Sequence, residues 1–355
     1  MPRVERWLHH PRSASGHFDF VRTVRRVPPN STLVIGTHGV RVNLKLPKEP
    51  DPVHDTIDRA AEALFERLIS EVAALPSDAV LALSGGLDSA AILACLCEIG
   101  RKPQVFTMVS RHAVTDESVW VERLVKHFGI PKPIRFNIDA FPPFVAGMPF
   151  GSGPQSQPTE PFETAFFALA SQAGPVVSGF GADQLFETTL RQRLHGAWRE
   201  GQWNVWNTEW TSTSPASFVR ELRRDEAIPR DVFDSWSWEV AMRGVVRVRN
   251  AMTSPLYAPF LSDAILDITR ASPAHWLHLA ALNKRLLRLA CKGHLPDDVR
   301  RRAKTAHFGP VIEASLERAR VAAGPDVLDP QWRNVVPAKW RQIAIRRWME
   351  NESAQ

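Results

Sequence analysis

The sequence has few cysteines, no long apolar run and no lysine-bearing phosphate loop, and each absence excludes a class of protein. Its 355 residues include three cysteines, Cys95, Cys97 and Cys291, which cannot all pair and show no metal-ligand spacing. We therefore expect buried, reduced thiols and a cytoplasmic protein. No run of about 18 apolar residues occurs, so the sequence predicts no membrane span. The pattern GxxxxGK[ST] is also absent, which excludes an ordinary P-loop nucleoside triphosphatase.

The formal net charge is +6, and much of the excess falls in residues 284–302. The basic side chains of this stretch are Lys284, Arg285, Arg288, Lys292, Arg300, Arg301 and Arg302. They could form a site for phosphates or an anionic partner. For most of the arginines we favour the simpler interpretation, a solvated helix face. No aromatic-interleaved binding motif supports a nucleic-acid partner.

Strand and helix patterns alternate through the first half of the chain. After an expected helix over residues 55–74, we expect strands over 79–83, 104–109, 134–138 and 175–177, and helices over 87–99, 118–128 and 162–173. This alternation predicts an α/β fold, with a parallel sheet flanked by helices and right-handed crossovers. Residues 18–46 are a small β-rich start, and beyond about residue 185 the pattern is mostly helical and rich in tryptophan. We therefore expect three parts, with the bounds 1–50, 51–190 and 191–355.

A glycine turn joins a predicted buried strand to a predicted helix in the stretch LALSGGLDSAAILACL, residues 81–96. Gly85 and Gly86 let backbone N–H groups approach an anion closely, and the helix N-terminus adds partial positive charge. Ser84 and Ser89 add hydroxyl donors. Asp88 would repel a phosphate unless Mg²⁺ lay between them. The turn therefore predicts a site for phosphate and Mg²⁺.

Three ordered motifs resemble one known family. SGGLDS, residues 84–89, matches the PP-loop of ATP pyrophosphatases, which transfer AMP to an oxygen and release pyrophosphate. VVSGFGADQLFE, residues 176–187, resembles the SGxGxDE(L/V)F segment of the asparagine synthetase family. Residues 283–308, with NKRLLR, then LP, then RAKTAHF, resemble the K-x-LLR…LP…R-x-K…F stretch of that family. The resemblance implies the PP-loop (adenine nucleotide α-hydrolase) fold and an ATP-dependent ligase that forms amides through an acyl-AMP.

The resemblance also implies site residues, with ATP and Mg²⁺ as cofactors. Its nucleotide-binding residues would be Ser84, Gly85, Gly86, Asp88, Ser89, Thr107, Met108, Ser178, Gly179 and Gly181. Asp88 and Asp183 would hold Mg²⁺. Lys284 and Lys304 stand where two lysines of the related β-lactam synthetases contact the phosphates and the reacting centre. Their ammonium groups would compensate charge on pyrophosphate and on the oxyanion formed by amine attack.

Two departures from the family refine these expectations. RVPPNSTLVI, residues 26–35, resembles the tail of the family's glutaminase domain, but residue 2 is Pro2 and no cysteine precedes Cys95. We therefore interpret residues 1–50 as a remnant, expect no glutaminase activity, and expect the amine to come from the substrate or from free ammonia. Phe180 stands where relatives place a glutamate or tyrosine that handles the amine, and it cannot accept a proton. His294, His307 and Glu187 are other candidate bases by sequence.

A peptide α-amine, with an ordinary pKa of about 7.7 to 8.0, is partly free base at neutral pH. The substitution by Phe180 therefore favours a peptide N-terminus as the nucleophile, as in the macrolactam synthetases of lasso peptides, which belong to this family. The tryptophans would then either fill the core or line a peptide cleft. The expected partners are a peptide or small-molecule carboxylate carrying its own amine, and a possible peptidase or leader-binding chain. The alternatives are a small-molecule amide or β-lactam-type synthetase, a PP-loop tRNA-modifying enzyme and a non-catalytic relic.

Overall fold

The computed structural model places eleven stretches of the chain. They are residues 31–37, 39–44, 55–141, 159–188, 190–199, 201–212, 214–216, 218–219, 245–279, 283–302 and 308–314. Residues 18–30 of the predicted β-rich start fall outside these stretches, as do Lys304 and His307. Among the described residues, no helix combines the length and apolar character needed to cross a bilayer.

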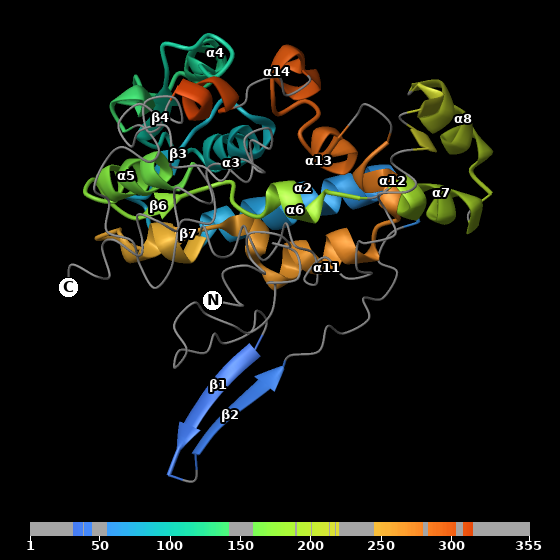
Figure 1. Ribbon diagram of the computed structural model, residues 1–355, viewed down its shortest axis with the longest axis horizontal. Coiled ribbons are helices and arrows are strands. Elements are labelled where there is room, and N and C mark those ends of the chain that lie inside the picture. The colour runs from blue at the N-terminus through green and yellow to red at the C-terminus, as the bar shows by residue number, and fades with distance from the viewer. Residues whose placement is uncertain are drawn as a thin grey trace, which may run out of the picture.

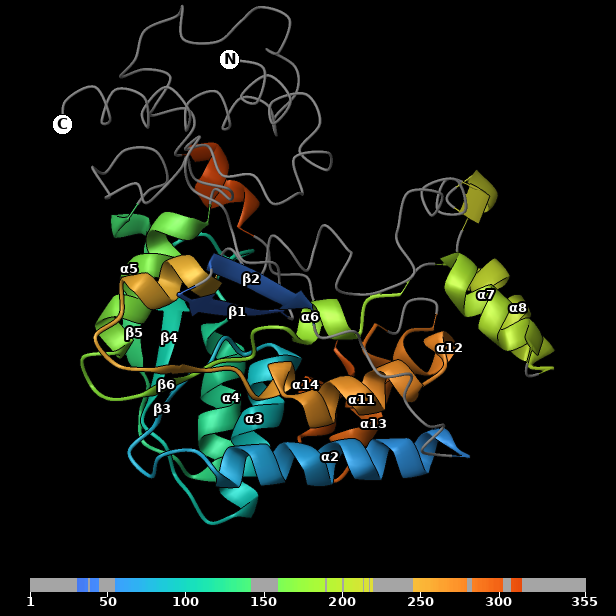
Figure 2. The same cartoon turned by 90° about the horizontal axis from the view of Figure 1, so that it is seen from below.

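The main sheet has five parallel strands in the order β5-β4-β3-β6-β7, and it lies in the left part of Figure 2. Its strands are β3 (Val80–Ala82), β4 (Val105–Val109), β5 (Ile134–Asn137), β6 (Val176–Val177) and β7 (Leu256–Tyr257). Apolar, β-branched runs favour these strands because both faces of the sheet are covered. The predicted α/β fold with a parallel sheet flanked by helices is therefore confirmed.

Helices cover both faces of the sheet, and the alternation of side chains along β3 shows how. Leu81 and Leu83 pack into a core cluster with one group of helices, whereas Val80 and Ala82 pack with α5 on the other face. The first group is α2 (Ile57–Ala73), α3 (Leu87–Glu98), α4 (Ser118–Phe128), α11 (Asp263–Ala271) and α13 (Arg285–Ala290). The second face is covered by α5 (Glu160–Ala170) and by side chains from residues 245–250 and 308–314.

The remaining elements surround this core. They are η1 (Ile138–Ala140), α6 (Ala182–Leu185), α7 (Leu190–Arg199), α8 (Trp203–Ser212), η4 (Pro259–Leu261), α12 (Ala274–Leu277) and α14 (Asp297–Arg301). An antiparallel hairpin of β1 (Ser31–Gly36) and β2 (Gly39–Leu44) projects from the body of the molecule in Figure 1. Its apolar side chains lie in solvent, with Ile35 74% and Val40 67% exposed.

The structure corrects three details of the predicted organisation. No strand was expected beyond residue 185, because a strand of two residues between Pro255 and Pro259 gives no readable pattern. Strand β7 nevertheless pairs in parallel with β6 and completes the sheet. Helix α5 starts two residues before the expected Phe162, since Pro161 suits a first turn. All three cysteines are free, but Cys97 is only partly buried. The bounds 1–50, 51–190 and 191–355 remain predictions.

The basic stretch 284–302 is not mainly the solvated face that we expected. Lys284, Arg288 and Arg300 are buried, with 7%, 5% and 5% of their surface exposed. Arg288 donates to the carbonyl oxygens of Arg300 and Arg302, at 2.5 and 3.1 Å, and Arg300 donates back to the carbonyl of Arg288 at 3.2 Å. These guanidinium groups tie α13 to α14 because each supplies several donors to carbonyls that no helix satisfies.

Helix α2 offers a test of the core. Leu68 is fully buried on its apolar face. We expect Leu68→Ala to lower the free energy of unfolding by about 2–5 kcal/mol, since the cavity cannot be refilled. Guanidinium titration would measure the loss. Glu62→Ala, on the solvent-exposed face of the same helix, should change stability by less than about 0.5 kcal/mol, and equal losses in the two variants would contradict the assigned packing.

Candidate active site

The candidate site lies where the strand order of the sheet changes direction. The chain proceeds outward from β3 through β4 to β5, and then returns to place β6 on the opposite side of β3. In open parallel sheets, ligands bind at such a switch point, outside the carboxyl ends of the strands. The turn after β3 and the turn after β6 flank this position, and they carry the two motifs singled out in the sequence.

The turn after β3 is a loop closed by its own serines. The main-chain N–H of Ser84 donates to Ser89 Oγ at 3.1 Å, and the N–H of Gly86 donates to Ser84 Oγ at 3.2 Å. Gly85 adopts φ 78°, which a residue with a Cβ rarely adopts. Helix α3 then begins at Leu87, with its N-terminus facing the loop. This is the arrangement that an anion at a helix N-terminus requires.

The turn after β6 approaches α3 so closely that it needs glycine. A Cβ on Gly179 would lie 2.9 Å from Asp88 Cβ, and one on Gly181, whose φ is 93°, would lie 2.1 Å from Leu261 Cδ2. Ser178 is buried, and its N–H donates to the carbonyl of Tyr257 on β7 at 2.9 Å. The two glycines therefore bring the start of α6, and with it the candidate ligand Asp183, beside Asp88.

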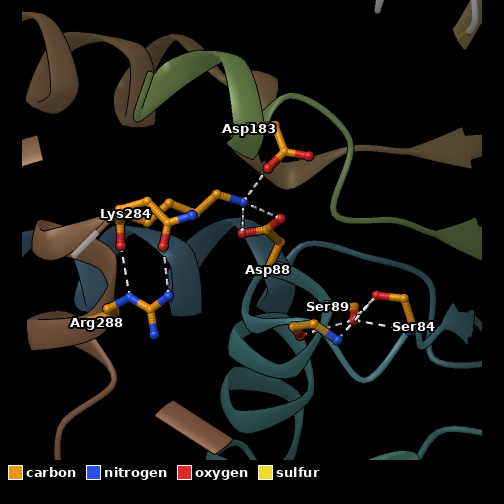
Figure 3. A network of polar contacts seen from close by, with 8 residues as sticks. Ser84, Asp88, Ser89, Asp183, Lys284 and Arg288 are labelled. Atoms are coloured by element: carbon orange, nitrogen blue, oxygen red, sulfur yellow. Dashed lines mark hydrogen bonds and ion pairs between the residues drawn. The ribbon is translucent and has the colours of Figure 1, made fainter. Parts of the chain in front are cut away.

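Lys284 joins these two carboxylates, as Figure 3 shows. Its Nζ lies 2.7 and 2.5 Å from the two carboxylate oxygens of Asp88 and 2.5 Å from Asp183 Oδ1. Burial lowers the pKa of Lys284, but the charges of Asp88 and Asp183 outweigh burial and raise that pKa above its usual value. The ammonium is therefore charged at neutral pH. The backbone of Lys284 is in the left-handed region, with φ 54°. Among the described residues other than glycine, Lys284 alone has a positive φ.

The chemistry of these donors fits Mg²⁺. Mg²⁺ prefers oxygen ligands and usually takes one or two carboxylates together with substrate phosphates. Among the described residues, no three His, Cys, Asp or Glu side chains gather as an all-protein metal site would need. Asp88, 19% exposed, and Asp183, 58% exposed, leave room for phosphate oxygens to complete the coordination. We therefore assign Mg²⁺ binding to these two residues as a hypothesis.

The other predicted residues occupy several positions. Thr107, buried, and Met108, partly buried, lie in the second half of β4, where they pair with β5 and could frame a base. Lys304 lies outside the described residues, and the nearest described residues on either side of it are Arg302 and Phe308. Arg302 donates to the carbonyl of Gly85 at 2.8 Å and pairs with Glu117, while Phe308 packs on Phe162 in the first turn of α5, with ring centroids 5.0 Å apart.

The other candidate bases suggested by the sequence lie at different distances from the site. His294 stacks on Phe65 of α2 at 3.9 Å and contacts Glu98, the last residue of α3. It therefore lies at the opposite end of α3 from Asp88. Glu187 is exposed just after α6, and His307 lies outside the described residues.

Phe180 faces an aromatic wall on α5. Its ring stacks on Phe167, with centroids 5.2 Å apart. One helical turn earlier on the same face stands Glu163, a residue that the sequence analysis did not single out. The signal was present, because a glutamate recurs at helical spacing on an otherwise apolar face, but no motif marked it.

Gly181 offers a test of the site's geometry with a matched control. Gly181 and Gly201 both have positive φ, yet a Cβ on Gly201 would meet nothing within 4 Å. We expect Gly201→Ala to cost about 1 kcal/mol from backbone conformation alone. Gly181→Ala should cost at least twice as much, because the methyl group collides with Leu261. Thermal unfolding of both variants would measure the difference, and equal losses would contradict the close packing.

Comparison with known proteins agrees with this geometry. The asparagine synthase family model matches residues 66–325. A comparison with curated proteins finds no match. The family match spans both glycine turns and Lys284, and it covers well over half of the 355 residues. The chain therefore belongs to the asparagine synthase family, whose members are ATP-dependent ligases that use Mg²⁺ and form amides through an AMP intermediate.

Proposed function

We propose that this ligase closes a macrolactam in a lasso-type peptide. A side-chain carboxylate of the peptide would receive AMP, and the N-terminal amine of the same peptide would then displace it. The observation that carries the proposal is the apolar contact of Phe180 with Phe167, at the position where relatives place an ionisable group. The apolar surface formed by these two rings can pack against the apolar peptide atoms next to the attacking amine.

Exposed aromatic side chains support a peptide substrate. The helices that follow Asp183, α7 and α8, present Trp198, Trp203, Trp206 and Trp210, which are 39% to 65% exposed. A buried ion pair between Arg193 and Glu209, at 2.6 Å, holds the two helices together. The four tryptophans therefore stand on a fixed support, and tryptophan is enriched at sites that bind peptides and proteins. In this respect the expectation that they fill the core does not describe these four residues.

Neutral, anionic and cationic groups of the site would each have a separate role. Backbone N–H groups of the loop at Gly85 and Gly86, with the N-terminus of α3, would receive phosphate oxygens of ATP. Mg²⁺, when bound by Asp88 and Asp183, would neutralise phosphate charge as pyrophosphate departs. The ammonium of Lys284 would turn from the two carboxylates towards the phosphates once these carboxylates have a metal partner. Lys304 keeps its predicted role at the reacting centre.

The structure weakens the support for a tRNA substrate. The basic stretch that motivated this alternative is in part buried, with Arg288 and Arg300 bonded to main-chain carbonyls. Charges used inside the protein cannot neutralise a phosphate backbone.

ATP–pyrophosphate exchange in the presence of Mg²⁺ tests the proposal. We expect exchange with linear peptides that carry an internal Asp or Glu, followed by release of a product lighter than the peptide by one water. Free amino acids and tRNA should support no exchange. Exchange with a small amino acid instead would indicate a small-molecule synthetase, exchange with tRNA would indicate a nucleic-acid substrate, and no exchange with any of them would contradict the proposal.

Asp88 offers a test of the site within the same assay. We expect Asp88→Asn to reduce exchange by roughly 100-fold or more, because even indirect partners of metal ligands contribute 10–100-fold. The matched control is Asp267→Asn, which removes an exposed carboxylate from α11 and should leave exchange unchanged. Equal exchange in the two variants would contradict the role assigned to Asp88.

A further inference from the structure

Glu163 lies on the face of α5 that meets the turn after β6. On that face Glu160, Glu163 and Phe167 follow one another at spacings of three and four residues, so their side chains form one row. Phe167 stacks on Phe180 at 5.2 Å, which fixes the direction in which the row points. Glu163 therefore stands one helical turn from Phe167, the residue on which Phe180 stacks.

The first turn of α5 lies at the carboxyl edge of the sheet, where the site is. At the other end of the helix, Ser171 bonds to Thr253 at 3.3 Å, just before β7 begins. The helix therefore runs opposite to the strands. Phe180 follows the carboxyl end of β6, so a position one turn before Phe167 lies further out, on the side of the glycine turns.

The surroundings of Glu163 raise its pKa into the neutral range. Burial raises the pKa of Glu163 to about 7, the hydrogen bond from the Thr159 hydroxyl opposes this, and the charge of Glu160 adds to it. Glu160 itself is buried and pairs with Arg247 from residues 245–250 at 2.7 Å. Arg247 therefore gives Glu160 a cationic partner, and the charge of Glu160 contributes to the raised pKa of Glu163.

We propose that Glu163 is the general base of amide formation, taking over the task that Phe180 cannot perform. This inference rests on the proposed function. The amine nitrogen forms a bond to the acyl carbon, the bond from that carbon to the AMP oxygen breaks, and AMP leaves with the electron pair. One N–H proton of the amine passes to the Glu163 carboxylate. A base whose pKa lies near the working pH suits this transfer.

The test separates the two half-reactions in the full-length protein. We expect Glu163→Gln to keep ATP–pyrophosphate exchange within about twofold of the unsubstituted protein, since no phosphate contact is lost. Product formation should fall by about 100-fold or more, the usual contribution of a general base. Glu163→Asp should restore part of it. Glu313→Gln, an exposed carboxylate on the segment that packs against α5, is the matched control and should change neither rate.

The pH dependence gives a second readout. Product formation should show an acid limb near pH 7 from Glu163 in addition to that of the amine, and Glu163→Gln should lack the first limb. Because the folded pKa lies above the ordinary 4.5, the stability that protonated Glu163 provides is lost as pH rises through about 7. The unfolding temperature of Glu163→Gln should therefore fall less steeply between pH 5 and pH 8 than that of the unsubstituted protein.

The outcomes distinguish the two proposals. Absence of exchange in the unsubstituted protein would count against macrolactam formation. Normal exchange with undiminished product in Glu163→Gln, or loss of product in Glu187→Gln instead, would overturn the role of Glu163. If Glu163→Gln does not fold, Glu160→Gln decides: it removes the charge that raises the Glu163 pKa, so the acid limb should move to lower pH. An unchanged acid limb would overturn the inference.

Discussion

The ammonium of Lys284 between the carboxylates of Asp88 and Asp183 is the interaction on which the site depends. The three residues come from α3, from α6 and from the position just before α13, and Lys284 and Asp88 are 196 positions apart. Two ionised carboxylates at close range repel one another, and a cation between them removes that cost. The ion pairs therefore hold three distant segments at one point before any ligand arrives.

This arrangement explains how the chain manages without a lysine in its phosphate loop. In a P-loop enzyme the cation and the glycine turn share one short segment. Here the turn at Ser84 to Ser89 supplies only backbone and hydroxyl groups, and the positive charge comes from a different part of the sheet's surroundings. Separating the two functions has a structural cost: Lys284 adopts a left-handed backbone that its Cβ disfavours, at about 1 kcal/mol.

How much was predictable from sequence depends on the range of the interactions. The helix bounds 118–128 were predicted as observed, and both glycine turns were located, because capping and periodicity are local. The burial of Arg288 and Arg300 was not predictable, since their partners are carbonyls brought near by tertiary packing. Strand β7 is two residues long and exists because β6 offers it an edge. Glu163 carries a local pattern, but its meaning depends on Phe180, which only the fold brings alongside.

Arg302 links the glycine loop after β3 to the start of α4. Its guanidinium bonds to the carbonyl of Gly85, pairs with Glu117 and lies over the ring of Trp120, 4.6 Å from the centroid. The glycine loop and the C-terminal end of α14 therefore cannot shift independently without breaking these contacts. A ligand that displaced the loop would also displace Arg302, so that an event at the carboxyl end of β3 would be transmitted to the end of α14.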